Sequence, residues 1–166
     1  RRSGKPDEAL NSYKQAATLK PDNAEILCNL GAAFQELDNL EDAIINYKRA
    51  ISLTPDNAKA HNNLGIALKK QGRLEESVEN YNRAIELKHD YAEAYNNLGI
   101  TLLLLDQIDE AIKNHRKAIM LIPLYAEAHY NLGIALRKLQ KLDEASACYK
   151  RAIAIKADYV EAHNNL

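Results

Sequence analysis

The dipeptide Leu-Gly recurs in this chain at a constant spacing. It stands at Leu30-Gly31, Leu64-Gly65, Leu98-Gly99 and Leu132-Gly133, so each glycine follows the previous one by 34 residues. A fixed period of this length indicates one supersecondary unit copied in tandem, with each copy burying its apolar face against its neighbours. The sequence therefore predicts a stacked repeat protein without a catalytic pocket.

The period divides the chain into complete units flanked by partial ones. Counted from Ala24, the complete units are residues 24–57, 58–91, 92–125 and 126–159. Residues 1–23 supply the second half of an earlier unit, and residues 160–166 open a further one. We therefore expect a single repeat array over residues 1–166 that starts and stops inside repeats, as a piece of a longer array would.

Each unit is expected to form two helices. In the first complete unit, one helical face is formed by Leu27, Leu30, Gly31 and Phe34. A second helical pattern covers residues 41–53, and Pro21, Pro55 and Pro123 are expected to end the second helices. A glycine inside a helix costs about 1 kcal/mol relative to alanine. Its recurrence predicts a close helix–helix approach, with Gly99 facing Ala111 in the third complete unit.

These elements resemble the tetratricopeptide repeat, whose pattern is aromatic-x2-Leu-Gly-x2-aromatic, then Ala-x3-aromatic, then Pro. The first complete unit matches with Leu27-x2-Leu30-Gly31-x2-Phe34, Ala43-x3-Tyr47 and Pro55. Departures are histidines in aromatic positions, namely His61, His115, His129 and His163. The resemblance implies an all-α, right-handed superhelix of antiparallel helix pairs. It also implies a protein-interaction scaffold whose first helices line a concave groove that binds an extended peptide or partner segment.

One residue type is constant on the expected groove face. Asparagine occupies the same place in every unit, at Asn29, Asn63, Asn97, Asn131 and Asn165. A side-chain amide can donate and accept hydrogen bonds, so a row of them could bind the backbone of a peptide of any sequence. This resembles the asparagine ladder in the superhelical arm of O-linked N-acetylglucosamine transferase. The alternative is that these amides bond a neighbouring helix or water.

The candidate groove residues extend beyond this row. They are Asn29, Asn62, Asn63, Lys69, Lys70, Asn96, Asn97, Tyr130, Asn131, Arg137 and Asn165. Within this set Lys69 and Lys70, together with Lys59, form a basic cluster that would either favour acidic ligand residues or remain solvated.

The third complete unit has apolar residues where the other units are polar. They are Leu103, Leu104, Met120, Ile122 and Leu124. Exposed apolar patches often mark contact sites, so this set predicts a contact patch, although local packing could also explain it. We expect self-association through the repeat ends first and through this patch second.

Composition argues against several other classes of function. The 166-residue chain has a formal net charge of −1, which removes the electrostatic case for binding nucleic acid or anionic membranes. Its longest apolar run, residues 102–105, is far too short to cross a bilayer. The two cysteines, Cys28 and Cys148, are far apart and are expected to be reduced thiols of a cytoplasmic protein.

No motif for catalysis or cofactor binding is found. The histidines at equivalent places, His61, His129 and His163, have no second ligand at zinc-type spacing and are expected to fill the aromatic packing position. Phosphate-binding loops, nucleophile elbows and paired CxxC motifs are absent. We therefore expect a non-enzyme without metal or cofactor. Two alternatives remain, a substrate-recruiting arm of a larger glycosyltransferase-like enzyme and a self-assembling structural module.

Overall fold

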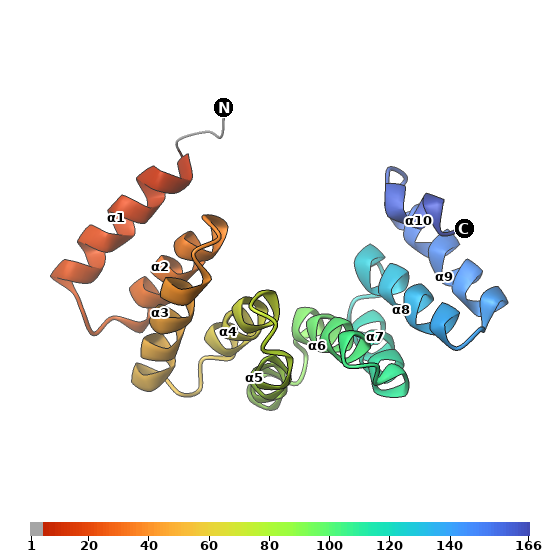
Figure 1. Cartoon of the computed structure of the whole chain (residues 1–166), viewed down its shortest axis with the longest axis horizontal. Coiled ribbons are helices and arrows are strands. Elements are labelled where there is room, and N and C mark those ends of the chain that lie inside the picture. Colours follow the sequence, from red (N-terminus) through yellow and green to blue (C-terminus); the bar gives the residue numbers. More distant parts are fainter. Residues whose placement is uncertain (1–4) are drawn as a thin grey trace. The chain divides into compact units, whose positions relative to one another are not determined.

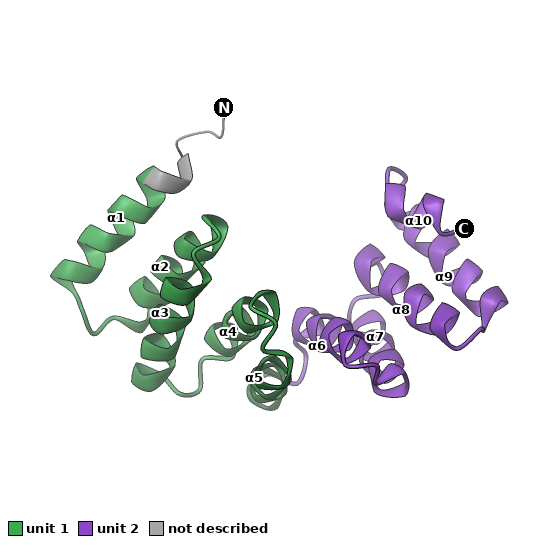
Figure 2. Ribbon diagram, in the orientation of Figure 1, with its two compact units in different colours: residues 1–88 green, residues 89–166 purple. Residues whose placement is uncertain are grey.

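The computed structural model describes residues 5–166, and over these residues the chain forms ten α-helices and no strand (Figure 1). The start of the predicted array, residues 1–4, lies outside the described residues. The chain divides into two compact units, Arg1–Lys88 and His89–Leu166, shown in different colours in Figure 2. The division falls in the loop between the fifth and sixth helices.

Unit 1 contains the first five helices. Their bounds are α1 (Lys5–Leu19), α2 (Ala24–Glu36), α3 (Leu40–Leu53), α4 (Ala58–Lys70) and α5 (Leu74–Leu87). Consecutive helices pack against one another, and α2 also contacts α4. The core of this unit is built from α2, α3 and α4, and its larger side chains are Leu27, Phe34, Tyr47, Leu64 and Leu68.

Unit 2 contains the remaining helices of the described chain. Their bounds are α6 (Ala92–Leu104), α7 (Ile108–Leu121), α8 (Ala126–Lys138), α9 (Leu142–Ile155) and α10 (Val160–Asn164). Consecutive helices again pack together, and α6 also contacts α8. Ile112, Leu132, Leu136 and Tyr149 form the core around α7, α8 and α9.

Local sequence signals set the helix ends. Asn23 and Asn57 cap α2 and α4, since each side-chain oxygen accepts a bond of 3.0 Å from a backbone N–H three residues later. The prolines stand two residues after the last residue of α1, α3 and α7, as predicted. The helices α5 and α9 end at equivalent positions without a proline, so packing and the period are sufficient there.

The turns inside the helix pairs need a left-handed backbone. It occurs at four equivalent positions, Asp38 (φ 61°), Gly72 (φ 80°), Asp106 (φ 59°) and Gln140 (φ 59°). Glycine adopts this conformation without cost and aspartate tolerates it, so three of these turns were predictable from residue type. Gln140 gives no such signal, and only its place in the 34-residue period identifies the turn.

The recurring glycines lie against aromatic or imidazole rings. A Cβ atom built on Gly31, Gly65 or Gly133 would lie 2.5–2.8 Å from Cε1 of Tyr47, Tyr81 or Tyr149, respectively. A Cβ on Gly99 would lie 2.6 Å from Cε1 of His115. The close approach was predicted, whereas the ring of His115 beside Gly99 was not; the facing of Gly99 and Ala111 stays a prediction. The ring four residues further along the second helix fills the space beside the glycine.

The small residue of the second helix has a different partner. The hydroxyl of Ser77, which is equivalent to Ala111, donates a 2.8 Å hydrogen bond to the carbonyl oxygen of Gly65. Small residues at this position therefore lie against the backbone of the first helix. Glycine and the small residue together allow the two helices of a pair to approach closely.

Candidate functional site

In unit 1, polar and charged side chains line one face of helix α4. Lys59, Asn63, Ile66 and Lys70 follow one another at intervals of four, three and four residues, which places them on one side of the helix. Lys59 and Lys70 are exposed, whereas Asn63 and Ile66 are half-buried. We call these four residues the α4 stripe. Asn29 is half-buried at the equivalent place on α2.

The repeated asparagines bond the preceding repeat. The Nδ2 atom of Asn131 donates to Oδ1 of Asn96 at 3.1 Å, and Nδ2 of Asn165 donates to the hydroxyl of Tyr130 at 2.9 Å. In unit 1, Nδ2 of Asn63 makes a long contact of 3.9 Å with Sγ of Cys28. Each of these pairs joins residues 35 positions apart. The donor side of the amide therefore joins neighbouring first helices.

Two predicted groove residues belong to the interior. Asn62 is fully buried and Asn96 almost fully, so their assignment to an accessible groove was wrong. Oδ1 of Asn96 accepts hydrogen bonds from Nδ1 of His115 at 3.0 Å and from Asn131. The residue before the repeated asparagine is turned by about 100° around the helix, and at Cys28, Asn62 and Asn96 it is buried.

His115 is a buried titratable side chain of unit 2. The ring is fully buried, and its Nδ1 carries the proton because Oδ1 of Asn96 can only accept. Within the described residues, Nε2 has no hydrogen-bond partner. Burial lowers the pKa of His115 from 6.5 to about 4, so the imidazole is neutral at pH 7.

The cations at the ends of the first helices differ in their partners. In unit 2, the guanidinium of Arg137 donates a 2.8 Å bond to Oδ1 of Asn165, and Nζ of Lys138 lies 3.3 Å from a carboxylate oxygen of Asp106. Among the described residues, the equivalent Lys69 and Lys70 of unit 1 form no ion pair or hydrogen bond. Burial, and then the charge of Lys70, lower the pKa of Lys69.

Tyr130, the aromatic residue of the predicted groove, packs against two other tyrosines. The ring centroid of Tyr130 lies 5.8 Å from that of Tyr149 and 5.0 Å from that of Tyr159. Tyr130 is half-buried, and its hydroxyl accepts the bond from Asn165. This residue therefore both packs in unit 2 and contributes to the accessible face of α8.

The predicted apolar patch is not one surface. Leu103 is half-buried and packs against the core of unit 2, whereas Leu104 is 60% exposed. Met120, Ile122 and Leu124 are also exposed. Because α6 and α7 form a hairpin, Leu104 lies at its turn, whereas the other three exposed residues lie at the far end of α7, about 20 Å away. The sequence grouping thus combined two separate surfaces and one packed residue.

The equivalent histidines bond the turn that precedes their own helix. Nε2 of His61, His129 and His163 lies 2.9–3.1 Å from the carbonyl oxygen six residues earlier. These contacts therefore join each first helix to the turn that connects it to the preceding repeat. Over residues 5–166, no group of three or more His, Cys, Asp or Glu side chains could hold a metal ion. In the same part of the chain, no helix is long and apolar enough to cross a membrane.

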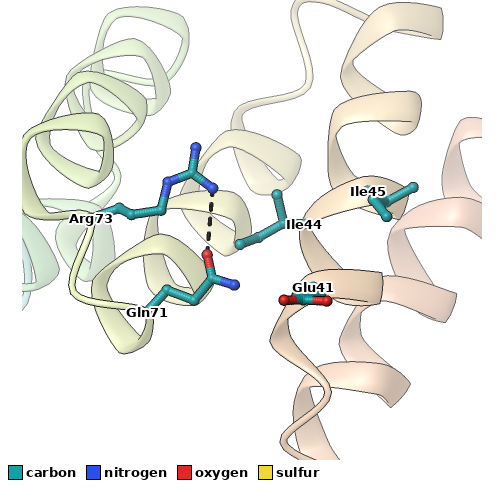
Figure 3. A pocket seen from close by; sticks show the side chains of 5 residues that line it. All are labelled: Glu41, Ile44, Ile45, Gln71 and Arg73. Carbon is teal, nitrogen blue, oxygen red and sulfur yellow. Dashed lines mark hydrogen bonds between the residues drawn. The ribbon is translucent and has the colours of Figure 1, made fainter.

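A cavity of about 400 Å³ lies between α3 and the turn that follows α4 (Figure 3). Glu41, Ile44, Ile45, Gln71 and Arg73 line it. The guanidinium of Arg73 bonds both carboxylate oxygens of Glu76 on α5, at 2.6 and 2.7 Å, and also Gln71 at 3.4 Å. The charge of Arg73 is therefore already compensated by Glu76, and the cavity lacks any residue of the α4 stripe.

Models of known protein families together match residues 1–159. A family model described as TPR repeat matches residues 1–38, 36–72, 67–106 and 102–140, and one described as Tetratricopeptide repeat matches residues 126–159. The chain belongs to the tetratricopeptide repeat family. The predicted all-α repeat fold is thereby confirmed.

Solved structures of this family have the same fold. A crystal structure of MamA is 28% identical, with a TM-score of 0.83 over 95% of this chain and 92% of that chain. MamA from Desulfovibrio magneticus RS-1 is 22% identical (TM-score 0.83, 94% and 88% covered). YrrB, described as a TPR protein with an unusual peptide-binding site, is 23% identical (TM-score 0.79, 97% and 83% covered). No curated protein sequence matches the chain significantly.

Proposed function

We propose that this chain is a protein-interaction scaffold that binds an extended peptide or partner segment along the exposed faces of its first helices. Membership of the tetratricopeptide repeat family supports a scaffold role, and YrrB is a family member described by its peptide-binding site. The observation that carries the proposal is the repeated asparagine. In three repeats its Nδ2 contacts the preceding first helix, which orients the amide before any ligand arrives.

An oriented amide is suited to bind a peptide backbone. With Nδ2 directed at the neighbouring helix, Oδ1 of Asn63 and of Asn131 remains to accept an N–H of the ligand. Side chains that are already fixed lose little conformational entropy on binding, which favours affinity. The two explanations of the asparagine row are thus compatible, since one end of the amide serves packing and the other serves binding.

The proposal includes a non-catalytic role without cofactor. It includes a protein or peptide as ligand rather than nucleic acid or membrane, because the net charge of −1 gives no electrostatic attraction to a polyanion. It also includes a cytoplasmic location, which the free thiols of Cys28 and Cys148 support.

Peptide selection followed by substitution tests this function. Peptides selected from a random library on the intact chain would be titrated against wild type and the double variant Asn29→Ala with Asn63→Ala. Loss of two hydrogen bonds is expected to weaken binding about 5- to 100-fold. The helical circular dichroism signal and the thermal melt should change little, because the one contact made by Asn63 is weak.

The exposed Asn11 of α1 provides a matched control. Asn11→Ala removes the same chemical group outside the proposed face and should leave the affinity unchanged. Failure to select any peptide, or equal affinity of wild type and the double variant, would refute backbone binding by these asparagines.

A second candidate is self-association through unit 2. Met120 and Leu124 are 64% and 65% exposed, and Ile122 lies between them. An apolar surface at the end of one helix and in the following turn favours contact with another protein surface, including a second copy of the chain. Sedimentation over a range of concentrations distinguishes this function from that of a monomeric scaffold.

A further inference from the structure

We propose that the α4 stripe of unit 1 selects a ligand segment with two acidic side chains on either side of an apolar one. This inference rests on the proposed peptide-binding function and names the class of peptide. The stripe offers Lys59 at one end of α4, Lys70 at the other, and Asn63 and Ile66 between them. Its two cations, amide and apolar side chain correspond to the acidic groups, backbone and apolar side chain of such a ligand.

Lys59 and Lys70 of the stripe, and the adjacent Lys69, have no ion-pair or hydrogen-bond partner among the described residues. None of the ion pairs or side-chain hydrogen bonds found over residues 5–166 involves Lys59, Lys69 or Lys70. In unit 2 the cations at the positions of Lys69 and Lys70 are both engaged within the protein. The lysines of unit 1 are therefore available to pair with acidic groups of a ligand, whereas Arg137 and Lys138 of unit 2 already have partners within the protein.

The half-buried Lys69 adds to the positive charge near the carboxyl end of α4. Its ammonium group is partly removed from water and stands next to the like charge of Lys70, and both effects lower its pKa. A partly desolvated cation without a counter-ion gains more from an incoming carboxylate than a fully hydrated one does. Lys69 thus adds to the attraction at the carboxyl end of α4.

The neighbouring first helix restricts where an acidic ligand can lie. On α2 the positions equivalent to Lys59 and Lys70 are occupied by Glu25 and Glu36, which are both exposed. Like charges facing each other disfavour a complex, so acidic side chains of a ligand are repelled from α2 and directed to α4. The opposite charges of α2 and α4 therefore determine which helix of unit 1 an acidic ligand contacts.

The spacing of the stripe defines the ligand. Lys59 and Lys70 are 11 residues apart, which corresponds to about 16 Å along a helix. In an extended peptide, side chains two and four residues apart lie on one face, and four residues span about 13 Å. The flexible lysine side chains cover the remaining difference. The expected pattern is therefore Glu-x-Leu-x-Glu, with leucine against Ile66 and a backbone N–H at Asn63.

Fluorescence anisotropy with two labelled peptides tests the inference on the full chain. One peptide contains Glu-Ser-Leu-Ser-Glu, and the other has glutamine in place of both glutamates. The acidic peptide is expected to bind about tenfold more tightly, as two exposed ion pairs allow. Raising the salt concentration should reduce the difference. Lys59→Gln with Lys70→Gln should abolish it.

A matched control removes two charges elsewhere. Lys48→Gln with Lys113→Gln lowers the net charge equally on exposed positions of the second helices and should keep the preference. Loss of the preference in this control would show a non-specific charge effect and overturn the inference. A preference that survives in the Lys59/Lys70 variant would also overturn it.

Two outcomes separate this inference from the proposed function. Equal binding of both peptides overturns the acidic preference but leaves peptide binding intact. If neither peptide binds, the acidic class is refuted, and the titration of library-selected peptides against the Asn29/Asn63 variant independently decides the proposed function.

Discussion

Because His115 is buried as a neutral imidazole, acidification is expected to destabilise the folded chain. The pKa of this side chain is about 4 in the folded state, against about 6.5 for an exposed histidine. The folded-state pKa is lowered, so between these two values the unfolded chain binds a proton that the folded chain does not. Stability contributed by His115 is therefore present at neutral pH and is lost as the pH falls.

The expected magnitude follows from the two pKa values. At about pH 5, nearly all unfolded molecules carry a proton on His115, whereas few folded molecules do. This difference lowers the free energy of unfolding by about 2 kcal/mol relative to pH 7.5. The cause is burial alone, with no charged neighbour contributing, so the effect should depend little on salt.

Urea unfolding followed by circular dichroism measures this effect when wild type is compared with His115→Phe. Phenylalanine keeps a ring beside Gly99, and Oδ1 of Asn96 keeps its bond from Asn131. Titration of the carboxylates is common to both proteins, so the difference between their pH profiles isolates His115. Parallel profiles between about pH 7.5 and pH 5 would refute the buried neutral imidazole.

Three further predictions concern packing, backbone and assembly. Gly65→Ala places a Cβ 2.7 Å from the ring of Tyr81 and should lower the free energy of unfolding by about 1–3 kcal/mol in urea titrations; an unchanged midpoint would contradict the packing. Gln140→Gly relieves a left-handed residue and should raise stability by about 0.5–1 kcal/mol in the same assay, whereas a loss would contradict the turn. Met120→Lys with Leu124→Lys should reduce any concentration-dependent association in sedimentation, and unchanged association would exclude this surface.

The helical framework could be predicted because the sequence repeats its own signals. Helices α2, α4, α6 and α8 begin at equivalent residues, and the period alone gives their register. Proline and asparagine add local stops and caps in some repeats. Where a repeat lacks such a signal, as at Gln140, its neighbours still identify the element, because all copies must stack in the same way.

The side-chain environments were less predictable than the helices. Asn62 and Asn63 are adjacent in sequence, yet one is buried and the other lies on the accessible face. The signal that separates them is the variation among copies. The position of Asn62 varies among the copies and holds cysteine at Cys28 and tyrosine at Tyr130, which suits an interior or half-buried place, whereas the position of Asn63 is always asparagine. Similarly, size matching suggested Ala111 as a neighbour of Gly99, but it did not predict that the ring of His115 fills the space beside Gly99.

The hydrogen bonds of unit 2 connect the accessible face to the core. Asn131 on the face donates to Asn96, and Asn96 also accepts from the buried His115, so one oxygen atom links three helices. A ligand that fixes the amide of Asn131 would therefore also hold Oδ1 of Asn96 in the position in which it accepts from Nδ1 of His115. The repeated asparagine thus couples binding on the face to the stability of the repeats that carry it.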